Sequence, residues 1–237
     1  GGGGGFTGEE AGASMSEQDT RRYWEREWLV TNGLGGYASG TVDGTFSRRY
    51  HGLLIAALPA GRTMVLNGIV ERLRLPDRNV YHLGPVEVSA VLPEQTVPVA
   101  NFQLDNGLPV WTYEVSGYVL EKRLVLPYRQ NTVHILYKLV SGPGSIRLGI
   151  RPAVHFRSHD APVSTPLQAS YTLAMVDDRC EISAGPDLPS LRLHFSGPHS
   201  AFTFERKTTG EIRYSREEER GYDFLGQVWS PGYYRAD

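Results

Sequence analysis

Short apolar runs that alternate with polar residues constrain this chain more than any other feature. Between residues 133 and 139 the odd-numbered positions hold Val, Ile, Tyr and Leu, whereas the even-numbered ones include His134 and Lys138. Residues 146–150 and 191–195 repeat the pattern, and Phe202 and Phe204 share one parity. Period-two alternation places one set of side chains on a buried face of a β-strand and the other toward solvent or a second layer. The chain is therefore expected to form many short strands.

Turn-forming sequences separate these runs, at residues 105–107, 141–144, 177–178 and 208–210. The 27 glycines and 15 prolines suit a chain with many turns and little helix. One charged run, residues 216–220, can form a single helical turn that stops at Gly221. The alternation of strands and helices typical of parallel sheets is missing. We therefore predict an all-β fold, an antiparallel two-sheet sandwich, with a barrel as the alternative architecture.

The two ends of the sequence differ in composition. Residues 1–20 begin with five glycines and are expected to form a flexible tail or a remnant of cloning. Residues 21–237 are expected to form one β-sandwich domain. The N-terminus lacks the basic and apolar regions of a signal peptide, and no apolar run approaches the ~18 residues of a membrane span.

Charge and cysteine content limit the partners and the location that the sequence favours. The net charge is −2 and the pI about 6.4, so no general attraction to nucleic acid or to an anionic membrane is expected. Cys180 is the only cysteine, so no disulfide can form within the chain. This cysteine usage fits a reducing cytoplasm.

Several familiar chemistries find no support. The stretch Asn32–Gly36 lacks the third glycine and the following helix of a dinucleotide-binding loop. His155 and His159 are four residues apart, but Pro152 and Pro162 argue against the helix that would pair them as zinc ligands. Cys180 has no obvious base nearby in the sequence that would make it a nucleophile. Glycosyl transfer needs two carboxylates that face each other, and the sequence alone does not identify such a pair among the acidic residues. We therefore assign no catalytic residue, metal or cofactor.

Two blocks carry a family resemblance. EWLVTNGLGGYASGTVDGTFSRRYHGLLIAAL, residues 27–58, resembles the opening motif of the N-terminal domain of bacterial and archaeal glycogen debranching enzymes of the amylo-α-1,6-glucosidase type. ERGYDFLGQVWSPGYY, residues 219–234, is similar to a second stretch of the same domain. The resemblance implies a large β-supersandwich, like the N-terminal domain of glucoamylases and similar in fold to galactose mutarotases.

The resemblance also implies that catalysis belongs to a different domain. In the family this domain precedes an α/α toroid, which carries the acids that hydrolyse the α-1,6 branch. No helical periodicity is left here to build a toroid, so the catalytic domain is expected to lie outside this chain, which would be inactive alone. The chain would then support its catalytic partner and help to hold α-glucan, as in glycogen. The glycines of residues 32–36 would shape a loop against that neighbouring domain.

Candidate binding residues come from the two blocks. The first block supplies the polar cluster Arg48, Arg49, Tyr50 and His51, together with Tyr37. The second block supplies Trp229 and Tyr233. The cluster is expected at the domain interface or near the glucan. Alternatively, its arginines form ion pairs within the domain and Tyr50 and His51 alternate between core and edge.

Two other functions remain open. A stand-alone carbohydrate-binding module would use exposed Trp229, Tyr233 and Tyr234 as a stacking platform for sugar. An aldose epimerase-like enzyme would need a His and Glu pair positioned over an open sheet.

Overall fold

The computed structural model describes residues 16–84, 95–167, 171–209 and 211–237. Most of the expected tail, residues 1–15, lies outside the described residues. The expected boundary at residue 20 differs from the structure, because helix α1 (Glu17–Trp24) begins before it. The Ser16 side chain accepts a hydrogen bond from the Asp19 backbone amide at 3.1 Å, and this cap explains where the helix starts.

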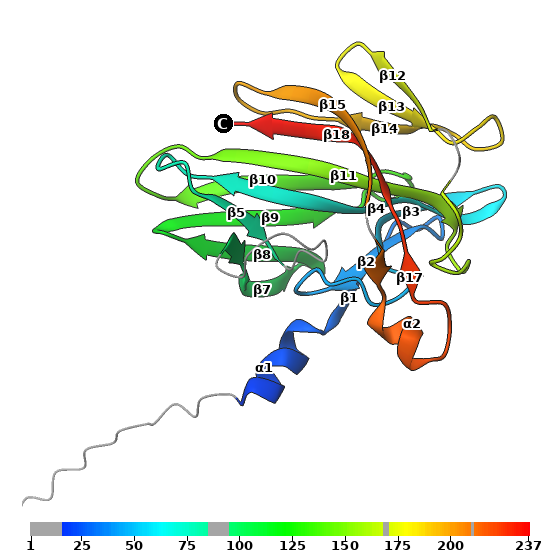
Figure 1. Cartoon of the computed structure of the whole chain (residues 1–237), viewed down its shortest axis with the longest axis horizontal. Coiled ribbons are helices and arrows are strands. Elements are labelled where there is room, and N and C mark those ends of the chain that lie inside the picture. Colours follow the sequence, from blue (N-terminus) through cyan, green and yellow to red (C-terminus); the bar gives the residue numbers. More distant parts are fainter. Residues whose placement is uncertain (1–15, 85–94, 168–170, 210) are drawn as a thin grey trace, which may run out of the picture.

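A nine-stranded sheet forms the centre of the fold (Figure 1). Its main path runs in the order β1 (Glu27–Thr31), β2 (Tyr37–Thr41), β3 (Gly52–Leu58), β4 (Gly61–Arg74), β11 (Arg147–Ser158), β18 (Trp229–Ala236) and β15 (Ala201–Thr208). β5 (Val80–Leu83) pairs with β4 and, in parallel, with β6 (Thr96–Val97). The other strand pairs within the described residues are antiparallel. The path ends at β1 and β15 without closing, so the sheet is open and not a barrel.

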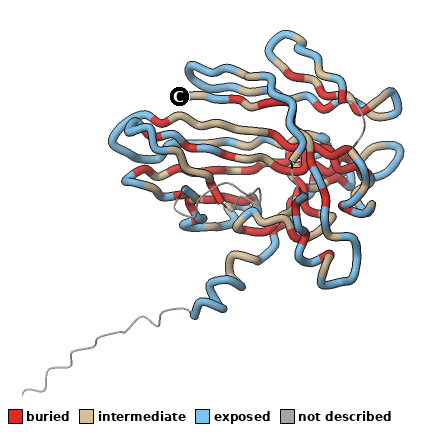
Figure 2. The backbone as a smooth tube through the Cα atoms, viewed as in Figure 1, coloured by how far each residue is buried: buried red, intermediate tan, exposed pale blue. Residues whose placement is uncertain are grey.

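Two smaller sheets contribute to the same hydrophobic core as the nine-stranded sheet. One has the order β10 (His134–Ser141), β9 (Tyr118–Val125), β8 (Leu108–Val115) and β7 (Val99–Asp105). The other consists of β12 (Thr172–Val176), β13 (Arg179–Ser183) and β14 (Leu191–His194). Leu124 of β9 and Ile182 of β13 are fully buried in that core. The buried residues gather where the sheets face one another (Figure 2).

The all-β antiparallel prediction is confirmed, with one difference in detail. The alternating runs form β10, β11, β14 and β15, and the turn at residues 105–107 joins β7 to β8. The sequence led us to expect two sheets, but the strands opposite the nine-stranded sheet are divided between two separate sheets. Hydrogen-bond pairing between strands distant in sequence decides this division, and alternation within a strand carries no information about it.

The opposite face of the large sheet is covered near its middle. β16 (Ile212–Arg213), α2 (Ser215–Glu219) and β17 (Leu225–Gly226) pack there. Ala153 and Val154 are neighbours on β11 but belong to two different hydrophobic clusters, as period-two geometry requires when both faces are buried. α2 is the helical turn predicted at residues 216–220.

A buried ion pair connects two sheets. Lys122 of β9 pairs with Glu71 of β4, and both side chains lie in the interior. The Tyr137 hydroxyl also donates a hydrogen bond to Glu71, at 2.7 Å. The Lys122 ammonium lies 5.1 Å from the centre of the Trp111 ring. The pair therefore fixes how the four-stranded sheet docks on the large one.

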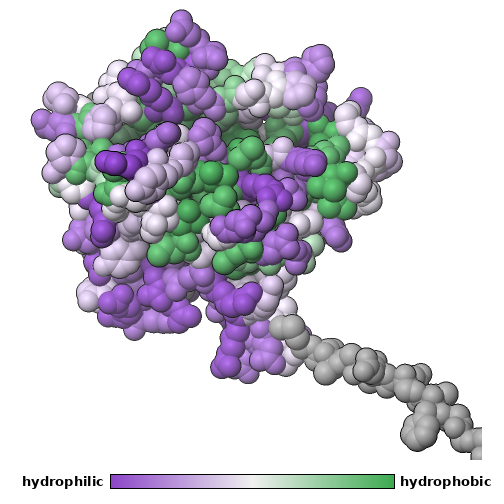
Figure 3. Space-filling model, turned by 180° about the vertical axis from the view of Figure 1, so that it is seen from behind, coloured by the Kyte–Doolittle hydropathy of each residue, from purple (hydrophilic) through white to green (hydrophobic). Residues whose placement is uncertain are grey.

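The surface is mixed in character. On the face opposite to that of Figure 1, apolar side chains form patches among polar ones (Figure 3). Leu29 of the edge strand β1 and Tyr128 are among the most exposed large apolar side chains of the described residues. No helix within the described residues has the length and apolar character needed to span a membrane.

Candidate functional site

The glycine-rich turn between β1 and β2 is built around one buried side chain. Asn32 accepts hydrogen bonds at Oδ1 from the amides of Leu34 and Gly36, at 2.9 and 3.0 Å, and donates from Nδ2 to the Gln130 carbonyl at 2.9 Å. A Cβ at Gly36 would lie 2.8 Å from the Ile55 carbonyl oxygen, so only glycine fits without a shift of the backbone. The turn thus packs against residues 128–131 of the same chain. That its glycines also shape a loop against a neighbouring domain stays a prediction.

The connection between β2 and β3 carries the polar cluster. Glu27 Oε1 accepts hydrogen bonds from Arg48 Nε at 2.5 Å and from His51 Nε2 at 2.8 Å. The Arg48 backbone amide donates to His51 Nδ1 at 3.4 Å, which makes Nδ1 an acceptor and places the ring hydrogen on Nε2. The edge strand β1 and the β2–β3 connection are therefore tied together by one carboxylate.

Burial and pairing set the charges of this group. Burial lowers the pKa of His51, and this effect outweighs the attraction of Glu27. Burial alone would raise the pKa of Glu27, but hydrogen bonds from Arg48 and His51 outweigh it and leave the pKa below its usual value. At neutral pH the group therefore holds an ionised carboxylate, a guanidinium and a neutral imidazole.

This group lies in an open cleft of about 550 Å³. Its lining includes Glu27, Trp28, Leu29, Thr31, Gly35, Gly36, Tyr37, Ser39, Arg48, Tyr50, His51, Arg62 and His159. The Tyr37 hydroxyl lies 3.1 Å from His159 Nδ1, and the rings of Tyr50 and His159 are 5.6 Å apart. Arg62 Nε donates to the Gly35 carbonyl at 2.7 Å. Burial raises the pKa of Tyr37 to about 12, so its hydroxyl keeps its proton.

Arg49 leaves the cleft and joins a second, structural network. Its backbone amide donates to Glu217 of α2 at 3.0 Å, and its guanidinium lies 3.5 Å from the same carboxylate. The guanidinium also packs 4.6 Å from the ring centre of Tyr222. Buried Arg157 of β11 donates to the Arg49 carbonyl at 2.8 Å. This network holds α2 and its following loop against the β2–β3 connection.

The structure thus sorts the sequence candidates into three groups. Tyr37, Arg48, Tyr50 and His51 meet in the cleft, and Arg49 does not line it. Trp229 is partly buried against Tyr171 at 4.9 Å, and Tyr233 lies beside Arg151. The expected exposed platform is wrong for Tyr234, which is only 6% exposed and stacks on Phe195, because its position on β18 faces inward.

Sequence reasoning missed three cleft residues with ionisable side chains, Glu27, Arg62 and His159. Glu27 stands at the head of the first block and shares a parity with exposed Leu29 and Thr31, a signal that could have selected it. Arg62 comes from β4 and His159 from the turn that follows β11, and no local pattern marks them. Among the described residues, no group of three or more His, Cys, Asp or Glu side chains could hold a metal ion.

The two sequence blocks, far apart in the chain, meet at Arg49 and Tyr222. A family model described as glycogen debranching enzyme N terminal matches residues 26–237. The chain belongs to this family. Neither curated proteins nor solved structures gave a match. In this family member the matched region contains every strand of the fold and the whole lining of the cleft.

Acidification is expected to destabilise the domain through its buried histidines. Burial lowers the pKa of His155, which is 1% exposed, to about 4 and also lowers that of His51. Between roughly pH 6.5 and pH 4 the unfolded chain therefore binds more protons than the folded one. The free energy of unfolding should fall as pH decreases through this window, by at most about 3 kcal/mol from His155.

Urea unfolding at several pH values measures this effect. His155→Gln should flatten the pH dependence, whereas His134→Gln, at an exposed position, should leave it unchanged. An unaltered pH profile in His155→Gln would contradict the assignment.

Proposed function

We propose that this chain is the non-catalytic N-terminal domain of a glycogen debranching enzyme, and that its cleft binds α-glucan beside a catalytic domain of the same polypeptide. One observation carries the proposal. The segment of residues 27–52, within the family match, folds so that Glu27, Tyr37, Arg48, Tyr50 and His51 share one open cleft. With a single, buried Cys180, the domain also suits the cytoplasm, where we place it.

The cleft offers the groups that sugars use. Tyr37 and Tyr50 present partly buried rings, whose faces pack against the apolar side of a glucose ring. Arg48 and Arg62 supply planar donors for sugar hydroxyls, and Glu27 supplies an acceptor. The hydrogen bonds and ion pairs among these side chains already fix their positions, so little conformational freedom is lost on binding.

The carboxylate content of the cleft supports a binding role. Glycoside hydrolysis uses two carboxyl groups, one on each side of the scissile bond. Among the described residues, Glu27 is the one carboxylate in the cleft lining, and it is held by Arg48 and His51. In our proposal the hydrolytic acids belong to the catalytic domain.

The geometry gives less support to an epimerase-like enzyme or to a stand-alone carbohydrate-binding module. An epimerase would place its acid and base around a sugar ring, but Glu27 and His51 contact each other at 2.8 Å and leave no space for a sugar oxygen between them. A stand-alone binding module on β18 would need an exposed platform, and Tyr234 is buried.

Titration of the chain with maltoheptaose tests the proposal. Tyr50→Ala should weaken binding about tenfold, equivalent to ~1.4 kcal/mol, because a ring face of the cleft is lost. Tyr233→Ala is the matched control, since it removes a tyrosine outside the cleft.

Three results would count against the proposal. The first is no heat of binding at millimolar sugar. The second is a loss of binding in Tyr233→Ala but not in Tyr50→Ala. The third is release of glucose from a 6-O-glucosyl-branched dextrin by the purified chain, which would contradict the non-catalytic role.

A further inference from the structure

Two segments that are far apart in the sequence form much of the cleft. The first wall is residues 48–51 of the β2–β3 connection, and the second wall is Arg62 of β4 together with the turn of residues 158–161. The His159 backbone amide donates to the Arg62 carbonyl at 3.0 Å, so the parts of the second wall are fixed to each other. The spacing of the two walls decides which groups a bound molecule can contact at the same time.

The side chain of Arg157, on β11, reaches both walls. Its Nη2 donates to the Arg49 carbonyl of the first wall at 2.8 Å. Its Nη1 lies within hydrogen-bonding distance of three carbonyls of the second wall, those of Ser158 at 3.2 Å, His159 at 3.4 Å and Ala161 at 3.2 Å. One planar guanidinium therefore holds the backbones of both walls in a fixed relation.

This guanidinium is buried without an ion pair. Arg157 is 5% exposed. Within the part of the chain that the structure describes, it forms no salt bridge, and its Nε has no hydrogen-bond partner. Burial lowers the pKa of the guanidinium, which still keeps its proton at neutral pH. Because a buried charge costs free energy of desolvation, the carbonyl contacts to the two walls are the interactions that offset this cost.

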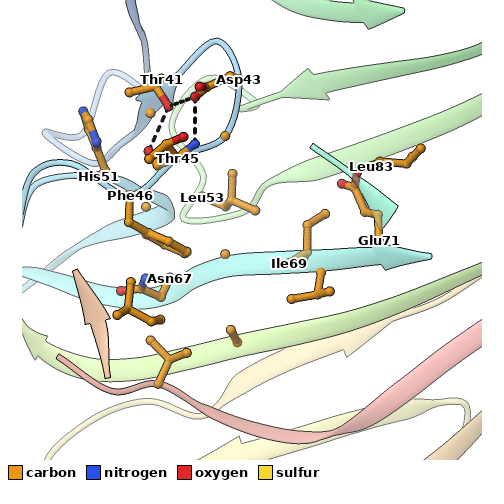
Figure 4. Close-up of a pocket in the computed structure, with 18 of the residues that line it drawn as sticks. Thr41, Asp43, Thr45, Phe46, His51, Leu53, Asn67, Ile69, Glu71 and Leu83 are labelled. Atoms are coloured by element: carbon orange, nitrogen blue, oxygen red, sulfur yellow. Dashed lines mark hydrogen bonds between the residues drawn. The ribbon is translucent and has the colours of Figure 1, made fainter. Parts of the chain in front are cut away.

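The β2–β3 connection is incompletely packed from behind. A pocket of about 160 Å³ lies between the connection and β4, and Phe46 and His51 of the connection line it (Figure 4). Atoms beside such a space lack packing contacts on that side. Hydrogen bonds hold the start of the connection, where Thr41 Oγ1 lies 2.9 Å from Asp43 Oδ1 (Figure 4). The end of the connection depends in the same way on polar contacts, and Arg157 supplies the buried one that leads to the second wall.

We propose that Arg157 is a positioning residue of the cleft, which sets the spacing of the two walls and thereby the arrangement of rings and donors that a sugar meets. This inference rests on the proposed function of the cleft. Another polar link between the walls, from the Arg49 guanidinium to the Asp160 carbonyl at 3.0 Å, is exposed and competes with water. Lysine cannot take the role of Arg157, because its ammonium donates from one point and does not span two walls as the guanidinium does.

Arg157→Lys tests the inference. The rings of Tyr50 and His159 are 5.6 Å apart, so we expect NOEs between their ring protons in the 237-residue chain without sugar, and a loss of these NOEs in Arg157→Lys. The dissociation constant for maltoheptaose should rise about tenfold in the same variant, because the cleft is no longer preorganised. Arg147→Lys is the matched control. It makes the same substitution on β11, at a residue that pairs with Asp237, and should change neither property.

Three results would overturn the inference: retained NOEs in Arg157→Lys, unchanged maltoheptaose affinity after their loss, or the same losses in Arg147→Lys. If the native chain binds no maltoheptaose, the proposed function fails, and the NOEs still decide whether Arg157 holds the walls together. If Arg157→Lys does not fold, the Arg157 Nη protons of the native chain decide. Slow exchange with NOEs to the Tyr50 and His159 amides would support the link, and rapid exchange without these NOEs would contradict it.

Discussion

Lys122→Met is expected to lower the free energy of unfolding by about 3–5 kcal/mol, because it leaves Glu71 as an unpaired charge in the interior. Glu71 is 4% exposed and would keep only the Tyr137 hydroxyl, at 2.7 Å, as a hydrogen-bond donor. Methionine fills a similar volume, so the loss of charge pairing dominates the effect. Urea unfolding monitored by tryptophan fluorescence measures it, since Trp111 lies beside the ammonium group.

The double variant separates pairing from packing. Glu71→Leu combined with Lys122→Met removes both charges and should recover most of the lost stability. Lys138→Met removes an exposed lysine from β10 and should change stability by less than about 0.5 kcal/mol. A double variant as unstable as Lys122→Met would show that the shape of these side chains, and not their charge, maintains the contact between the sheets.

Asn32→Ala is expected to destabilise the domain by about 2–4 kcal/mol. The side chain is 0% exposed, and its loss leaves the amides of Leu34 and Gly36 without their acceptor and the Gln130 carbonyl without a donor. Urea unfolding measures the global effect, and hydrogen exchange at the Gly36 amide reports on the turn itself.

The same variant tests the link between the turn and the cleft. Gly35 and Gly36 line the cleft, so Asn32→Ala should also weaken maltoheptaose binding if our proposed function is right. Asn101→Ala, at an exposed strand position, is the matched control and should affect neither property. A change in stability of less than about 0.5 kcal/mol in Asn32→Ala would contradict the role assigned to this side chain.

The run Arg48–His51 shows how far sequence reasoning reaches into the site. The residue types indicated a polar cluster, but not which side chains belong together. Arg48 turns to Glu27 and lines the cleft, whereas Arg49 turns to Glu217 and stabilises α2. The segment is an irregular connection in which the His51 amide bonds to the Arg48 carbonyl, so no strand periodicity predicts the direction of its side chains.

The aromatic candidates at the other end illustrate the opposite case. Trp229 and Tyr234 looked suited to an exposed platform, yet they pack against Tyr171 and Phe195. β18 lies between β11 and β15 inside the large sheet, and this position decides which of its residues are buried. Strand order depends on contacts between distant segments, and a single sequence contains no direct signal for it.

The sequence by itself determined the all-β class and many of the strands and turns, because alternation and turn chemistry act over a few residues. It also determined the family, because two long blocks carry the resemblance. Only the tertiary structure decided that strands opposite the large sheet form two separate sheets and that Glu27, Arg62 and His159 complete the cleft. These features join residues up to 132 positions apart, as Glu27 and His159 are within the cleft. Pairing and packing between sheets bring them together, and no local pattern encodes such contacts.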